Sequence, residues 1–207
     1  MTPSIAKSRS HETLRRYEVQ INETLPEIEP TGDLQPQDAQ SVAIRCVVLS
    51  HLIGIGFGGH APRLKALLEE FDLYRHASPK EQDLLSRNEH TEQERVDATW
   101  LTECVQSLAW CLGLANLDPF RRCDDDLASH FPAPAADPRD FISGATLRPF
   151  EEIYQQADLH YRLHWAARNA RLMGHRSRVS EESIGERRKA LDWVIGVANW
   201  DEIPDST

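Results

Sequence analysis

Hydrophobic positions along this chain recur every three to four residues, which is the spacing of helices packed on a core. The stretch 91–112 is apolar on most sides, as in a helix at the centre of a fold. The sequence has no alternating strand pattern of useful length. It therefore predicts an all-α fold, a single-domain multi-helix bundle. The predicted helices span about 37–53, 62–76, 91–112, 149–173 and 180–199, with a short one after Ser78.

The segments between these helices are also distinctive. Residues 1–9 are predicted to be a flexible N-terminus, and 10–207 a single α-helical domain whose first helix starts at Ser10. An irregular connection is expected around 115–146, where P-A-P-A-A-D-P is rich in proline. The glycine cluster G-I-G-F-G-G at 54–59 follows a helix rather than a strand, so we interpret it as a helix end and not as a phosphate-binding loop.

Three of the predicted core helices carry charged residues on sides that should be buried. Asp158 and Arg162 lie between two apolar sides of their helix, at the i, i+4 spacing of a helical ion pair. Buried charges need partners and hydrogen bonds. We therefore predict one buried network, made of Glu103, Asp158, Arg162, Glu186 and an arginine of the pair Arg187 and Arg188.

Two roles for this network stay open. The favoured one is structural, because a buried polar network fixes the register of the helices that share it. The other role is ligand binding, in which Arg162 and either Arg187 or Arg188 bind an anionic ligand.

His160 and His164 have the i, i+4 spacing of a helical zinc site. The chain lacks H-E-x-x-H here, and the cationic Arg162 between the two histidines disfavours a dication. They are weak metal candidates only, and we expect a polar helix edge or packed imidazole rings, no metal and no cofactor.

Composition narrows the class of partner. The formal net charge of −10 argues against nucleic acid, which requires clustered Lys and Arg. No apolar run approaches a membrane span, the N-terminus lacks the apolar region of a secretory signal, and the four cysteines form no C-x-x-C pair. We therefore expect a cytoplasmic protein without a nucleic-acid or membrane partner.

Several motifs together resemble the bacterial family called domain of unknown function 4272. They are T-W-L-T-E-C-V-Q-S-L-A-W-C-L-G-L (99–114), L-R-P-F-E-E-I-Y-Q-Q-A-D-L-H-Y-R-L-H-W-A-A-R (147–168), E-R-R-K-A-L-D-W-V (186–194) and the closing W-D-E-I-P-D-S-T, where a serine interrupts the usual final D-T. The resemblance implies a helical fold and no assigned activity. It implies typical positions at Trp100, Glu103, Trp110, Asp158, Arg162, Trp165, Glu186 and Arg187.

On these grounds we favour a non-enzymatic protein that binds a protein partner. One version is an immunity or antitoxin-like role, in which the acidic surface meets a basic effector. The alternative is an enzyme or a small-molecule or anion binder that uses the charged cluster, with or without a metal. The sequence does not specify the oligomeric state.

Overall fold

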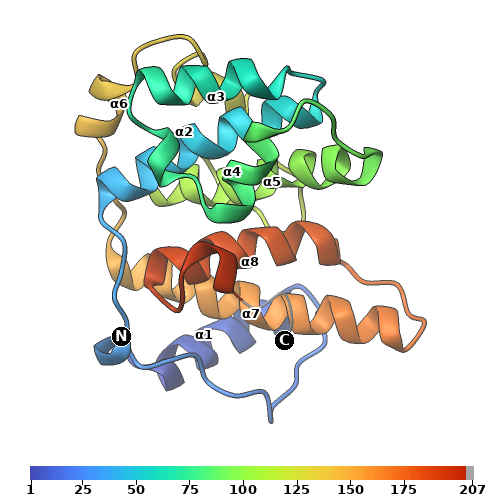
Figure 1. The fold of residues 1–207 in the computed structure, drawn as a ribbon. Coiled ribbons are helices and arrows are strands. Elements are labelled where there is room, and N and C mark those ends of the chain that lie inside the picture. The colour runs from blue at the N-terminus through green and yellow to red at the C-terminus, as the bar shows by residue number, and fades with distance from the viewer. Residues whose placement is uncertain (204–207) are drawn as a thin grey trace. The chain divides into compact units, whose positions relative to one another are not determined.

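The computed structural model describes residues 1–203, which contain eight α-helices, four short 3-10 helices and no strand (Figure 1). The predicted all-α class is confirmed. The chain divides into two compact units. Unit 1 comprises residues 1–37, 118–122 and the chain from 148, and unit 2 comprises 38–117 and 123–147. A single domain over 10–207 stays a prediction.

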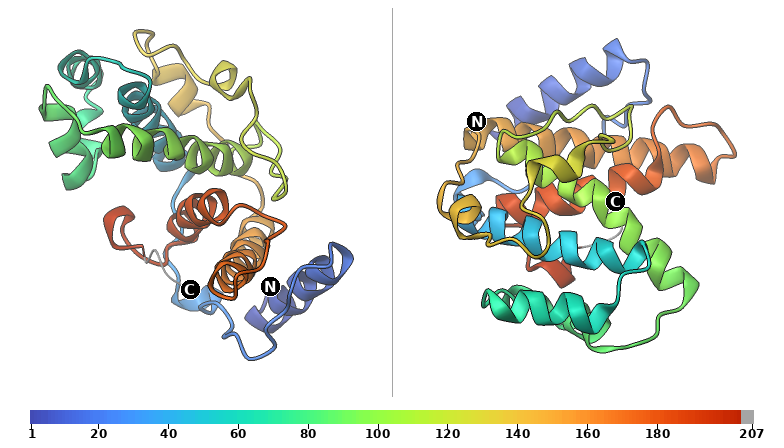
Figure 2. Two further views of the ribbon diagram at one scale, coloured as in Figure 1. Left: turned by 90° about the vertical axis from the view of Figure 1, so that its right-hand side faces the viewer. Right: turned by 90° about the horizontal axis from the view of Figure 1, so that it is seen from above.

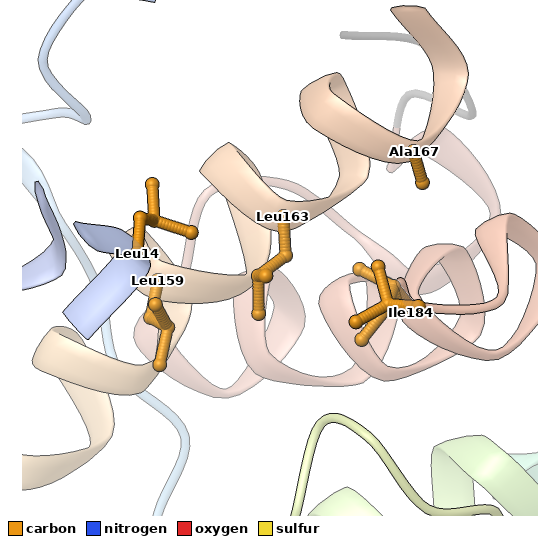
Figure 3. Close-up of a cluster of buried hydrophobic side chains, with 6 residues drawn as sticks. Leu14, Leu159, Leu163, Ala167 and Ile184 are labelled. Atoms are coloured by element: carbon orange, nitrogen blue, oxygen red, sulfur yellow. The ribbon is translucent and has the colours of Figure 1, made fainter. Parts of the chain in front are cut away.

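Unit 1 is built on three helices: α1 (Pro3–Arg16), α7 (Phe150–Leu172) and α8 (Glu181–Ile195). Figure 2 shows α7 lying between α1 and α8, as expected for a helix with two apolar sides. Figure 3 shows part of the core that they share. Leu14 comes from α1, Leu159, Leu163 and Ala167 from α7, Val179 precedes α8 and Ile184 lies within it. Two 3-10 helices, η1 (Thr31–Asp33) and η4 (Trp200–Glu202), complete the unit.

The N-terminal segment differs from the sequence-based expectation. α1 starts at Pro3, with Thr2 as its N-cap, so the predicted helix start at Ser10 is wrong. The flexibility of residues 1–9 stays a prediction. Proline at the first helical position after a threonine cap is a strong start signal. Ala6 is fully buried, and Ser10 accepts a hydrogen bond from Gln155 of α7 at 3.0 Å. Contacts with α7 therefore hold the beginning of the chain in place.

Unit 2 centres on α2 (Ala39–Gly56) packed against α5 (Glu92–Cys111). Capping boxes begin α5 and α4, which confirms the predicted starts after Thr91 and Ser78. The smaller elements are α3 (Ala61–Glu70), η2 (Tyr74–His76), α4 (Pro79–Ser86), η3 (Leu127–His130) and α6 (Arg139–Ser143). Only η3 and α6 interrupt the predicted irregular connection 115–146.

Three helix ends differ from the predicted positions, and left-handed residues explain two of these differences. The helix predicted over 62–76 ends at Glu70, because Asp72 adopts a left-handed conformation with φ of +59°. α8 ends at Ile195 rather than near 199, because Gly196 caps it with φ of +87°. α2 instead continues past Ile53 through two glycines to Gly56.

Length and composition alone would allow α2 to cross a membrane, which the sequence analysis did not expect. Within residues 1–203 it is the one helix with this property, and 56% of the apolar window is buried inside the structure. It also carries Arg45, whose guanidinium makes a buried two-bond ion pair with Glu81 of α4 at 2.8 and 3.1 Å. α2 thus has the features of a core helix of unit 2.

The crossing of α2 and α5 depends on the missing side chain of Gly56. A Cβ atom there would lie 2.7 Å from Cγ2 of Thr99 and 2.9 Å from the carbonyl oxygen of Arg95. We predict that Gly56→Ala lowers the free energy of unfolding by about 1–3 kcal/mol, because the overlap outweighs the helix-propensity gain of alanine. Urea denaturation measures this. Gly32→Ala is the control, because no atom lies within 4 Å of its added Cβ; equal effects of the two changes would contradict the prediction.

Candidate functional site

Unit 2 contains an apolar pocket with a volume of about 600 Å³. α2 supplies Val47, His51 and Ile53, α5 supplies Thr102 and Val105, and the end of α3 supplies Leu68. Phe71 and Leu73 follow α3 and also line the pocket, and most of the remaining wall is the segment from Cys123 to Pro138, which runs through F-P-A-P-A-A. Every residue that lines the pocket belongs to unit 2. We call this cavity the unit 2 pocket.

Two buried side chains of α5 fix the start of that irregular wall. Gln106 donates to the carboxylate of Asp124 at 2.8 Å and accepts from the N–H of Asp124 at 3.0 Å. Its amide also donates to the carbonyl of Asn116 at 2.6 Å. Glu103 accepts a hydrogen bond from the N–H of Cys123 at 3.2 Å. Both side chains are 2% exposed, so these bonds form away from water, where they are strongest.

His51 of α2 lies against the other end of the wall. Its Nδ1 is 2.8 Å from the carbonyl oxygen of Val47, and its Nε2 is 3.3 Å from that of Pro134. A neutral imidazole has one N–H to donate, so the shorter contact is the hydrogen bond in that state. The wall is therefore held more firmly near Asp124 than near Pro134.

Apolar surface continues from the unit 2 pocket to its outside. Phe57, which follows α2, lines the pocket and is 74% exposed. Ala133, Pro134 and Ala136 of the irregular wall are also exposed. The carboxyl groups of Asp124 and Asp125 are the charged groups among the lining residues. The pocket thus offers an apolar interior and negative charge.

The predicted ion pair of α7 is present in unit 1. Arg162 donates to both carboxylate oxygens of Asp158, from Nε at 2.9 Å and from Nη2 at 2.8 Å. Nη2 also donates to the carbonyl of Pro26 at 3.3 Å. Asp158 is fully buried and Arg162 is 2% exposed. Nη1 of Arg162 is buried without a hydrogen-bond partner in the described part of the chain.

Arg188 of α8 has a carboxylate partner that the sequence analysis did not name. Its Nε donates to Asp192 at 3.0 Å, and its Nη1 lies 3.3 Å from Nδ1 of His164. The guanidinium also stands 4.9 Å from the ring centroid of Tyr161. Burial raises the pKa of Asp192 to about 6, although Arg188 opposes this shift.

Arg187 of α8 has a different role in unit 1. Its guanidinium donates to the backbone carbonyls of Asp118 at 2.7 Å and Arg121 at 2.8 Å, and so holds the short segment 118–122. Glu186 and Trp165 are half-buried members of unit 1, and Trp110 is half-buried in unit 2.

The structure thus brings some predicted residues together. Asp158 contacts Arg162 directly. Glu103 belongs to unit 2, so its membership in one network with the charges of unit 1 stays a prediction.

His160 and His164 differ in their surroundings. Nδ1 of His160 lies 2.9 Å from the carbonyl of Gln156, and its Nε2 is buried without a partner in residues 1–203. Burial lowers the pKa of His160 to about 4, so the ring is neutral in the folded protein. No group of three His, Cys, Asp or Glu side chains that could hold a metal ion occurs within those residues.

Sequence reasoning missed the unit 2 pocket, because its walls come from four stretches that are separated in the chain. Two signals were present: an aromatic residue, Phe57, inside a glycine cluster that ends a helix, and the apolar F-P-A-P-A-A run inside an irregular connection. Exposed or loop-borne apolar residues are a sign of a binding surface.

Comparison with known proteins identifies one family. The family model described as Domain of unknown function (DUF4272) matches residues 6–203, nearly the whole chain. The final D-S-T, in which the resemblance departed from the family pattern, lies outside the described residues. No curated protein and no solved structure matches the chain.

The ion pair of α7 generates a stability prediction. Arg162→Met leaves the carboxylate of Asp158 buried and unpaired, so we expect the free energy of unfolding to fall by about 3–5 kcal/mol. Asp158→Leu combined with Arg162→Met removes both charges and should recover most of that loss. Urea denaturation of the three proteins tests this. A single variant as stable as the parent would mean that the pair is not structural.

Two buried groups of unit 1 predict opposite pH effects. His160 has a folded pKa of about 4, below its ordinary 6.5, so its contribution to stability is lost as pH falls from 6.5 towards 4. Asp192 has a folded pKa of about 6, above its ordinary 3.8, so its contribution is present at low pH and lost as pH rises through 6.

Denaturation between about pH 7 and pH 5 separates these groups. His160→Gln should reduce the loss of stability on acidification by about 2 kcal/mol. Asp192→Asn should make that loss steeper, because it removes the group that acidification favours in the folded state. The same pH profile in both variants and the parent would contradict both assignments.

Proposed function

The chain belongs to the family described as Domain of unknown function (DUF4272), and for this member we propose a binding role in which an apolar segment of a partner protein enters the unit 2 pocket. The observation that carries the proposal is the cavity of about 600 Å³ with apolar walls and an exposed phenylalanine at its edge. Ligand pockets have volumes of roughly 300–1,000 Å³ and mostly apolar walls with a few polar groups. The unit 2 pocket fits that description.

A protein segment fits this site better than a small molecule. A compound that filled only the cavity would leave the ring of Phe57, which is 74% exposed, in water. A helix or extended segment would cover Phe57 and the exposed Pro134 while it placed one or two side chains inside the pocket. Apolar anchors in a central pocket, surrounded by surface that excludes water, carry most of the affinity in protein interfaces.

Charge indicates what kind of segment this is. Asp124 and Asp125 line the pocket, and the whole chain has a net charge of −10. A partner with Lys or Arg beside its apolar anchors would associate faster and in a defined orientation. An immunity or antitoxin-like role, with a basic effector as the partner, is the narrower form of this proposal and is supported by the charge alone.

A second candidate is an anion binder at Arg162. Its support is the buried Nη1 atom, which has no partner within residues 1–203. Asp158 already neutralises this guanidinium through two hydrogen bonds, so the two N–H groups of Nη1 remain for an anion. The pocket is the stronger candidate, because it offers space as well as contacts.

Site-directed photocrosslinking tests the pocket. A benzophenone amino acid at position 57 should yield an adduct with a Lys- or Arg-rich protein in cells that express the chain. The same group at Val96, which is 42% exposed on α5 and does not line the pocket, should not. Thr102→Trp places a large ring in the cavity and should abolish the adduct at position 57, while circular dichroism confirms that the variant is folded.

The outcomes are distinct. An adduct from both positions, or one that persists in Thr102→Trp, would contradict the proposal. Native mass spectrometry of the purified chain tests whether a small molecule occupies the unit 2 pocket. A bound apolar compound that is lost in Thr102→Trp would make the pocket a small-molecule site instead.

The charge at the pocket gives a separate prediction. Asp125→Lys should weaken binding of the crosslinked partner roughly two- to fivefold, as expected for an exposed charge pair. Glu92→Lys is the matched control, because residue 92 is exposed and roughly 15 Å from Thr102 along α5, beyond the screening length. Titration by fluorescence anisotropy measures both affinities. An equal loss in the two variants would indicate a general effect of net charge.

A further inference from the structure

Two large apolar side chains stand in water at the end of α7. Leu172 is 67% exposed and Met173 is 64% exposed. The helix closes directly behind them, where Gly174 adopts φ of +71° and the N–H of His175 donates to the carbonyl of Ala170 at 2.7 Å. This backbone geometry fixes both residues at a helix end, and neither belongs to the core cluster shown in Figure 3. We call residues 168–178 the α7 tip.

The α7 tip is basic within an acidic protein. Its 11 residues contain four arginines and one histidine and no Asp or Glu. The whole chain, in contrast, has a formal net charge of −10. Basic residues stand on both sides of the exposed apolar pair: Arg168 and Arg171 before it, and His175, Arg176 and Arg178 after it.

The arginines of the tip differ in their partners. Arg171 makes two hydrogen bonds to Glu181 at 2.6 and 3.0 Å, and Arg178 is paired with Glu18. Arg176 is exposed and makes no hydrogen bond or ion pair within residues 1–203. Its charge is therefore available to an anion from outside the chain.

Arg176 also borders an open hollow on unit 1. Ser177 and the rings of Tyr17 and Phe120, whose centroids are 4.5 Å apart, line the same hollow. Asp118 lines it as well, with one carboxylate oxygen occupied by the N–H of Phe120 at 2.9 Å. A guanidinium and a hydroxyl beside aromatic rings can hold a phosphate oxygen while the rings stay in contact with apolar groups.

We propose that the α7 tip docks this protein on an anionic phospholipid surface. Leu172 and Met173 enter the layer between headgroups and acyl chains, and Arg176 contacts a headgroup phosphate. Stable attachment of this kind needs two signals, apolar insertion and basic charge, and the tip carries both. Our sequence-based expectation of no membrane partner rested on the lack of a spanning segment and did not consider surface attachment.

The shape of the tip favours a lipid surface over an acidic protein. The two apolar residues project from a helix end, and a protein partner would need a cavity shaped to receive them. A fluid lipid interface closes around such a projection without a preformed cavity. Glu181 and Glu18 are paired with arginines of the tip, and acidic groups more than about 8 Å away are largely screened at physiological salt, so the acidity of the rest of the chain does not prevent contact.

Vesicle cosedimentation of the full chain tests this proposal. The protein should sediment with phosphatidylcholine vesicles that contain phosphatidylserine and should not sediment with pure phosphatidylcholine vesicles. Binding should weaken with added salt. Leu172→Ser combined with Met173→Ser should lower the partition coefficient at least about tenfold, because it removes the inserted apolar groups. Arg176→Glu should also lower it.

Matched controls come from α1 of the same unit. Ile5→Ser alters another exposed apolar residue, which is 47% exposed, and Arg9→Glu makes the same charge change as Arg176→Glu on an exposed helix position. Both controls should bind vesicles like the parent. No sedimentation with phosphatidylserine vesicles at low salt would overturn the proposal, as would equal losses in tip and control variants. Binding that depends on Arg176 but not on Leu172 and Met173 would overturn insertion.

Discussion

The requirement that buried polar groups be hydrogen-bonded shapes the irregular part of unit 2. After α5 the chain forms little regular structure, so its backbone groups lack helical partners. Glu103 and Gln106 supply those partners from inside the unit, at the N–H groups of Cys123 and Asp124 and the carbonyl of Asn116. Their bonds hold the loop at a defined place beside α2 and α5. These bonds thus fix the start of the segment that forms the irregular wall of the unit 2 pocket.

In unit 1 the buried polar groups are mainly charged side chains, and they too are hydrogen-bonded to partners. Asp158 and Arg162 on α7 neutralise each other within one helix, and Arg188 and Asp192 do so on α8. Each pair joins opposite charges within one helix, although Nη1 of Arg162 is left without a partner in residues 1–203. Arg187 differs, because its acceptors are backbone carbonyls of a segment distant in the sequence. The charged side chains of unit 1 therefore mainly hold its helices and the segment 118–122 in position.

Local patterns in the sequence predicted the structural features that depend on interactions between residues close in the chain. Hydrophobic periodicity located the long helices, the Thr91 capping box gave the start of α5, and the i, i+4 rule gave the pair Asp158 and Arg162. The helix ends near 70 and 195 depend on left-handed residues, which composition alone does not fix. The pocket and the acceptors of Arg187 depend on segments tens of residues apart, and no single window of sequence contains that information.

The assembly of unit 1 from separated stretches affects how the chain is made. α1 leaves the ribosome before α7, yet residues that pack against Leu14 and bond the backbone of Ala6 lie in α7, which begins at Phe150. At ordinary elongation rates that helix follows on the order of ten seconds later. During this interval the apolar side of α1 has no native partner helix and is exposed to chaperones and to aggregation. Because of the interleaved order of the two units, α1 can pack on its native partner only after α7 has been synthesised.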